Sequence, residues 1–144
     1  MKLLIINGPN LNKTGYREKT VYGARTLDEI NSYVKERLEE EGISVEFFQS
    51  NSEGAIIDKI HSADAFGIVL NAGAYTHYSY AIRDALKCTQ AKTVEVHMSN
   101  VHTREEFRNT SVLAANCVGV VCGFGAESYI LAALALKKMY EETK

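Results

Sequence analysis

The stretch KLLIINGPNLNKTGYREKTVYG occupies residues 2–23 and decides the fold. Its opening run from Lys2 to Ile6 is short and apolar, which is typical of a buried parallel strand. The residues that follow show neither helical nor strand periodicity until Thr26, where a helix start is evident. Long connections of this kind in compact domains are usually functional or disordered. Because this one carries Asn, Arg and Tyr side chains directly after a core strand, we interpret it as an active-site loop.

Length and composition indicate one globular domain. The chain has 144 residues, enough for a substantial core, so we expect residues 1–144 to form a single domain. A formal net charge of -2 with mixed signs provides no extended field for nucleic acid or for a membrane surface. No apolar run approaches the roughly 20 residues that span a bilayer. There is no charged-then-apolar leader either, so we expect a cytoplasmic protein.

The cysteine and histidine patterns favour neither a disulfide nor a metal site. The three cysteines are Cys88, Cys117 and Cys122. Their number is odd and two of them lie in or beside an apolar segment, so we interpret them as buried, reduced thiols. The histidines His77, His97 and His102 come from different predicted loops and lack the spacing of zinc ligands. A metal site is the lesser alternative, and we predict none.

Apolar runs of strand length alternate with helical patterns along the chain. The expected strands are residues 2–6, 45–49, 66–70, 93–96 and 118–122. Helices are expected between the capping box at Thr26 and Gly42, from Ser52, over 79–88 and over 126–142, with a helical turn near Glu105. This alternation predicts an α/β fold: a flavodoxin-like, doubly wound, five-stranded parallel sheet in the order 2-1-3-4-5, with helices on both faces.

Polar side chains collect after the carboxyl ends of the predicted strands. Residues 7–10 follow the first strand, 71–77 the third, 97–102 the fourth and 123–125 the fifth. In doubly wound sheets the ligand binds outside this edge. Asn and Gly are common turn residues, so each group alone also fits a structural turn. Their convergence on one edge is the stronger indication of a site.

Glu95 and His97 lie two residues apart at the end of the fourth predicted strand, so their side chains point to the same face. A carboxylate in that position can hold one imidazole nitrogen and leave the other free as an acid or base. The same spacing also fits a structural ion pair.

The first loop places Arg17 and Tyr22 five residues apart. A free phenol has a pKa of about 10, too high for a base near neutrality. A guanidinium held against a phenol favours the phenolate and lowers that pKa. The residues alone leave open whether this pair is catalytic or only faces solvent.

Several motifs, taken in order and spacing, resemble a known family. They are Ile-Asn-Gly-Pro-Asn-Leu from residue 6, Gly-Tyr-Arg-Glu from 15, Val-Tyr-Gly from 21, Leu-Asn-Ala-Gly-Ala-Tyr-Thr-His from 70, Val-Glu-Val-His-Met-Ser-Asn-Val-His-Thr-Arg-Glu-Glu-Phe-Arg from 94 and Gly-Phe-Gly from 123. Across essentially the whole chain they resemble type II 3-dehydroquinate dehydratase of the shikimate pathway.

The resemblance implies a lyase that needs no cofactor and no metal. It would dehydrate 3-dehydroquinate to 3-dehydroshikimate through an enolate, the third step of chorismate and aromatic amino acid biosynthesis. Tyr22 would be the base that removes the proton beside the ketone, and Arg17 would keep it a phenolate. His97, oriented by Glu95, would be the acid that protonates the departing hydroxyl. Asn10 would position the water or donor that stabilises the enolate oxygen.

The resemblance also implies a substrate-binding set and an assembly. The set comprises Asn71, Met98 and Ser99 for the carboxylate, His77 and Arg108 for ring hydroxyls, and Asp84, which would reach the site of a neighbouring subunit. The family assembles trimers into dodecamers, so we expect a homo-oligomer of that kind. Residues 12–22 would form a lid that opens for substrate and closes to exclude water.

The chain departs from the family pattern in two places. Lys19 stands where many relatives have proline, which would make the lid more mobile, and Ala114-Ala115 replaces polar or proline residues.

The alternative function is that of a non-catalytic, flavodoxin-like binding or receiver module. A receiver needs clustered acids after the first strand and a lysine after the fifth, and this chain has neither. A dinucleotide module needs Gly-x-Gly-x-x-Gly after the first strand, which is also missing.

Overall fold

The computed structural model describes all residues, 1–144, and contains one sheet of five parallel strands in the order β2-β1-β3-β4-β5. The strands are β1 (Lys2–Asn7), β2 (Ser44–Gln49), β3 (Gly67–Asn71), β4 (Lys92–His97) and β5 (Gly119–Cys122). The predicted fold class and strand order are confirmed, and no strand end differs from the expected one by more than one residue.

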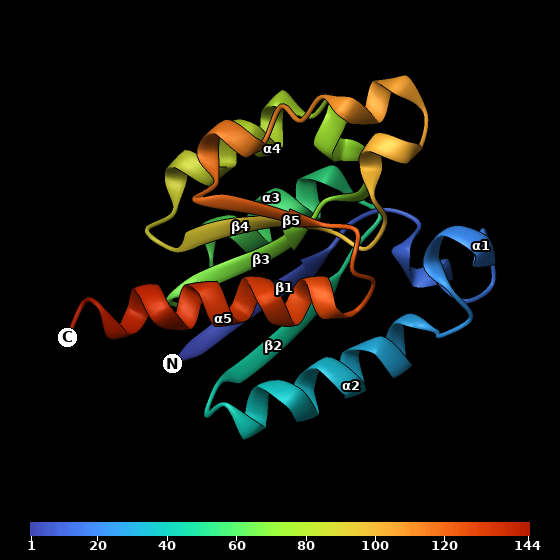
Figure 1. Cartoon of the computed structure of the whole chain (residues 1–144). Helices are drawn as coiled ribbons and strands as arrows, with labels where there is room; N and C mark the ends of the chain where they lie inside the picture. Colours follow the sequence, from blue (N-terminus) through green and yellow to red (C-terminus); the bar gives the residue numbers. More distant parts are fainter.

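Helices cover both faces of the sheet (Figure 1). One face carries α2 (Leu27–Glu40) and α5 (Glu127–Glu141), and the other carries α3 (Glu53–His61) and α4 (Tyr80–Ala85). The predicted capping box is present at the start of α2, between Thr26 and Glu29. The helix expected over 79–88 is shorter, because its last turn tightens into a 3-10 turn, Leu86–Cys88. None of these helices combines the length and apolar character needed to cross a membrane.

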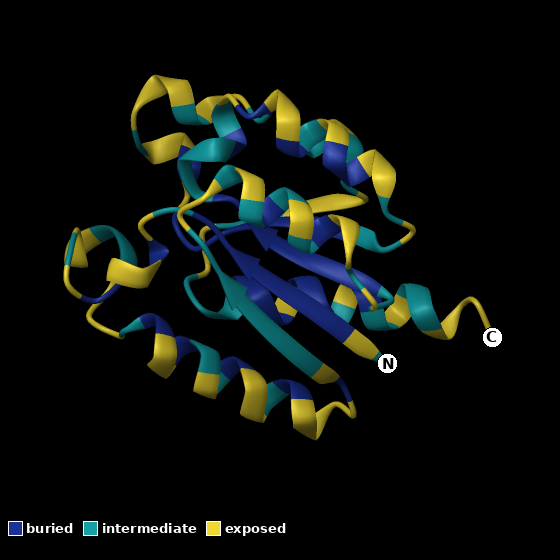
Figure 2. Ribbon diagram, turned by 180° about the vertical axis from the view of Figure 1, so that it is seen from behind, coloured by how far each residue is buried: buried dark blue, intermediate teal, exposed yellow.

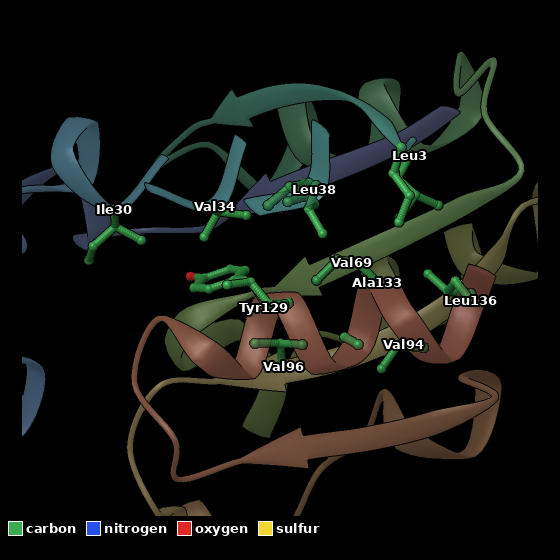
Figure 3. Packing of buried hydrophobic residues seen from close by; sticks show 14 of the residues in the cluster. Leu3, Ile30, Val34, Leu38, Val69, Val94, Val96, Tyr129, Ala133 and Leu136 are labelled. Atoms are coloured by element: carbon green, nitrogen blue, oxygen red, sulfur yellow. The ribbon is translucent and has the colours of Figure 1, made fainter. Parts of the chain in front are cut away.

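Alternate residues of β1 supply two separate cores, as the pleat of a strand requires. Leu3 and Ile5 pack against α2 and α5, whereas Leu4 and Ile6 pack against α3 and α4. Figure 3 shows the first core, where aliphatic side chains of α2 and α5 meet those of the central strands. Figure 2 shows the central strands as the most buried part of the sheet and the outer faces of the helices as exposed.

The edge strand β5 is less covered than a doubly wound sheet predicts. Val120 of this strand is 48% exposed and Val118, directly before it, is 50% exposed, and neither packs in the two cores. The prediction that the thiols are buried is wrong for Cys88, which is exposed, and only partly right for Cys117 and Cys122, which are half-buried. All three thiols are free, as expected.

A buried polar cluster ties α5 to the ends of the two central strands. Asn7 ends β1 beside Asn71, which ends β3. Tyr129 of α5 is 1% exposed; its hydroxyl donates to Asn7 Oδ1 and accepts from Asn71 Nδ2 at 2.9 Å. Burial raises the pKa of Tyr129, so the phenol stays a neutral donor. Because leaving a buried amide unpaired is costly, this cluster stabilises the ends of both strands.

We predict that Tyr129→Phe lowers the free energy of unfolding by about 1–3 kcal/mol, because it leaves two buried amides without their shared partner. Urea denaturation followed by circular dichroism measures the change. Thr93→Val is the matched control, since the Thr93 hydroxyl is buried without a partner and its removal should cost little. Equal losses in the two variants would contradict the role assigned to Tyr129.

Candidate active site

A pocket at the carboxyl edge of the sheet gathers most of the predicted site residues. All of the predicted residues line it except Glu95, which lies behind His97, and Asp84, which lies elsewhere. The loops after β1, β3 and β4 supply its walls, as expected for a doubly wound sheet. The short helix α1 (Lys19–Tyr22) supplies the remaining wall.

The imidazole of His97 is held from behind by a carboxylate. His97 ends β4, and its Nε2 lies 2.9 Å from Oε2 of Glu95. Glu95 is only 2% exposed, so its charge depends on the partners that surround it. Its other oxygen, Oε1, accepts a hydrogen bond from the hydroxyl of Ser111, a residue that the sequence did not single out. The predicted Glu95–His97 pair therefore exists and has a third member.

His77 is held against His97 in a fixed protonation state. It ends the 3-10 turn Gly73–His77, and its ring stacks on that of His97 with 6.2 Å between centroids. His77 Nδ1 donates to the carbonyl oxygen of Thr110 at 2.8 Å, since a carbonyl can only accept. Burial lowers the pKa of His77, the Thr110 hydrogen bond opposes that shift, and the neighbouring charges of His97 and Arg108 add to it. His77 is therefore a neutral imidazole near pH 7.

Two guanidinium groups flank Tyr22, of which the sequence identified one. Arg17 lies over the ring face, with its guanidinium carbon 5.2 Å from the ring centroid. Arg104 Nη1 donates directly to the phenol oxygen at 2.7 Å. Arg104 belongs to a segment that reads as an ordinary solvated turn, yet its side chain is only 9% exposed. The direct cationic partner of the phenol is therefore Arg104.

The same arginine holds the lid against the sheet. Arg104 contacts Ser99 Oγ at 3.3 Å and lies 3.8 Å from the carboxylate of Glu18. The lid was expected to have no regular structure, but Lys19 begins the helix α1 within it. Glu18 precedes that helix with φ 42°, a left-handed conformation that is unfavourable for a residue with a side chain. Arg104 thus joins a strained lid segment to the loop that follows β4.

The loop after β1 approaches β3 so closely that only glycine fits at its start. A Cβ on Gly8 would lie 2.5 Å from the carbonyl oxygen of Ala72. This approach brings Asn10, whose φ is 67°, to the pocket rim, where its backbone N–H donates to Asn51 Oδ1 at 3.0 Å. Asn10 is one of the residues that line the pocket.

The remaining predicted binding residues are partly engaged within the protein. The Asn71 amide donates one hydrogen bond to the hydroxyl oxygen of Tyr129, and its Oδ1 accepts one from the N–H of Gly73 at 3.3 Å. Arg108 forms an ion pair with Glu105 at 3.2 Å and still reaches the pocket. Met98 and Ser99 line the pocket directly after β4.

The comparison with known families agrees with this geometry. A family model described as "Dehydroquinase class II" matches residues 1–137. The chain belongs to the class II dehydroquinase family. By this membership the chain is an enzyme, a type II dehydroquinase.

Relatives and solved structures place the chain well inside this dehydroquinase family. A 3-dehydroquinate dehydratase from Clostridium beijerinckii is 55% identical in an alignment that covers 96% of this chain and 99% of that protein. The crystal structure of a type II dehydroquinase from Butyrivibrio crossotus superposes with a TM-score of 0.91 at 50% identity, covering 95% of this chain and 97% of that one. A type II dehydroquinase from Propionibacterium acnes gives a TM-score of 0.88 at 40% identity, covering 96% of this chain and 94% of that one.

Two observations complete the description of this dehydroquinase site. Asp84 is exposed on α4 and does not line the pocket of its own chain. No group of three His, Cys, Asp or Glu side chains lies together in a way that could hold a metal ion.

Proposed function

We propose that the chain eliminates water from 3-dehydroquinate to give 3-dehydroshikimate through an enolate intermediate. The observation that carries this proposal is a single pocket that holds both the phenol of Tyr22, bonded to a guanidinium, and the imidazole of His97, backed by a carboxylate. Removing a proton beside a ketone needs a base, and losing a hydroxyl needs an acid. Relatives at about half identity that carry the name 3-dehydroquinate dehydratase support the same substrate.

Tyr22 is the proposed base. The guanidinium of Arg104, bonded to the phenol oxygen, and that of Arg17, over the ring, stabilise a phenolate by their charge. The phenolate takes the proton from the carbon beside the ketone, and the electron pair of that C–H bond moves onto the ketone oxygen to form the enolate. Asn10 positions a water or donor against this oxygen, where it stabilises the developing charge.

His97 is the proposed acid. In its protonated form it donates one proton to the departing hydroxyl while Nε2–H stays bonded to Glu95. The enolate electron pair returns to form the conjugated C=C bond as the C–O bond breaks, and water leaves. Tyr22 then releases its proton and His97 regains one, so the cycle consumes no net proton. These steps use only side chains of this chain.

Substrate binding is assigned to the loops after β3 and β4. The backbone N–H groups at Met98 and Ser99, together with the amide of Asn71, suit a carboxylate because they bind an anion without a buried cation. His77 and Arg108, on the same wall as His97, are placed for ring hydroxyls.

The assembly and its location are also part of the proposal. Asp84 does not line the pocket of its own chain, so a role at a site requires a neighbouring subunit. The partly uncovered edge at Val118 and Val120, with Phe124 63% exposed nearby in sequence, offers apolar surface for such a contact. We propose a homo-oligomer, trimers assembled into a dodecamer, in the cytoplasm.

We predict that Tyr22→Phe lowers kcat by about 10²- to 10⁴-fold with little change in KM, because the ring stays and only the base is lost. The ultraviolet absorbance of the conjugated enone measures turnover of 3-dehydroquinate, with a chelator present to test metal independence.

Tyr16→Phe is the matched control, since that phenol is 73% exposed in the same loop and should be dispensable. A flat trace from folded wild-type protein would instead favour a non-catalytic binding module. An activity that the chelator abolishes would contradict the metal-free mechanism.

We also predict that Arg104→Gln lowers kcat more than Arg17→Gln does, by about tenfold or more, because Arg104 alone bonds the phenol oxygen. The same absorbance assay at saturating substrate compares the two variants with wild type. The reverse ranking would show that Arg17 is the group that sustains the phenolate.

A further inference from the structure

We propose that Ser111 is a positioning residue for the reaction, which orients Glu95 and through it the acid His97. The inference rests on the proposed role of His97. Ser111 does not line the substrate pocket, and it acts by a hydrogen bond to the carboxylate behind the imidazole.

The hydrogen bonds of Ser111 have a fixed direction. A hydroxyl has one proton to donate and two lone pairs that accept. The Ser111 oxygen accepts from the backbone N–H of Leu113 at 3.1 Å and from that of Ala114 at 3.0 Å. With both lone pairs engaged, its proton is directed at Oε1 of Glu95. Ser111 is therefore an obligatory donor to the carboxylate.

The hydrogen bond from Ser111 orients Glu95, and Glu95 in turn orients His97. The donor on Oε1 holds the Glu95 carboxylate, which is 2% exposed, in the orientation that presents Oε2 to His97 Nε2. Nε2 consequently carries a proton, and the other ring nitrogen is the one that exchanges a proton with the substrate. Without Ser111, the Glu95 carboxylate can rotate, and the imidazole loses its fixed orientation.

The segment that carries Ser111 is anchored on both sides. The N–H of Val112 donates to the carbonyl of Thr76 at 2.9 Å, and Arg83 of α4 donates to the carbonyl of Val112 at 2.8 Å. The residue before Ser111, Thr110, accepts from His77. Two consecutive residues thus hold both imidazoles of the site, one through a carbonyl and the other through Glu95.

Ser111 should affect one chemical step and spare the other. It contacts the acid side of the site and makes no hydrogen bond to the lid, which carries Tyr22. Loss of its hydroxyl should therefore slow C–O cleavage, while proton removal by Tyr22 continues. An enolate that cannot lose its hydroxyl takes a proton back from Tyr22 and returns to substrate. In deuterated water this step delivers deuterium to the carbon once the Tyr22 hydroxyl has exchanged with solvent.

The test is Ser111→Ala assayed in deuterated water. Enone absorbance gives product formation, and mass spectrometry of the remaining 3-dehydroquinate gives deuterium uptake beside the ketone. We expect kcat to fall about tenfold or more, KM to stay within about twofold, and the ratio of exchange to product formation to rise about tenfold. A kcat within about twofold of wild type, or a fall without a change in that ratio, would overturn the proposal.

Three comparisons keep the result interpretable. Thr76→Val removes a buried hydroxyl that has no partner and should leave both rates unchanged; losses there equal to those of Ser111→Ala would indicate a general packing defect and overturn the proposal. Ser111→Thr keeps the hydroxyl and should recover kcat to within about threefold of wild type. If Ser111→Ala fails to fold, Ser111→Cys carries the test, because its thiol is a weak donor of similar size. Wild-type kinetics in Ser111→Cys would then contradict the role.

Wild-type activity separates this inference from the proposed function. Absence of enone from folded wild-type protein contradicts the proposed function itself. Active wild type together with an equally active Ser111→Ala contradicts only the positioning role.

Discussion

The hydroxyl of Tyr129, held between Asn7 and Asn71, is the contact on which the geometry of the site depends. Both amides are the last residues of central strands, and two of the loops that line the pocket begin directly after them. The N–H of Gly8 donates to the carbonyl of Asn71 at 2.7 Å, so the two loops leave the sheet as a pair. An unpaired polar group at this depth is costly, which restricts the strand ends to one arrangement.

The proposed chemistry divides between the sheet and the loop that is proposed to act as a lid. His97, Glu95 and Ser111 belong to β4 and an anchored segment beside it, and their partners are set before substrate arrives. Tyr22 belongs to the lid, and Arg104 brings it to the sheet. Under the proposal the acid is preorganised, while the base is assembled when the lid closes. With this division, the lid can open for substrate while the hydrogen bonds that orient His97 stay in place.

The strands could be predicted because each is an apolar run bounded by turn residues, and a parallel sheet buries such runs on both faces. The Glu95–His97 pair followed from the two-residue period of a strand, which fixes direction without any knowledge of neighbours. The roles of Arg17, Tyr22 and the binding residues came instead from family resemblance.

What the sequence did not reveal depends on partners that are distant along the chain. Arg104 meets Tyr22 across 82 positions, and Tyr129 meets Asn7 across 122, so no local pattern predicts either contact. Tyr129 also lies in an Ala- and Leu-rich helix, where an aromatic residue reads as ordinary core. In the sequence Ser111 is an ordinary loop residue. Its role follows from the two backbone N–H groups that donate to its oxygen, and only the structure shows these.

The most direct test of the account is a crystal structure of the Tyr22→Phe variant, which should be nearly inactive, with 3-dehydroquinate bound. The account predicts that the substrate carboxylate lies at Met98 and Ser99, that the carbon beside the ketone faces the ring at position 22, and that the departing hydroxyl lies within hydrogen-bond distance of His97. A substrate bound outside this pocket, or with that hydroxyl directed away from His97, would contradict it.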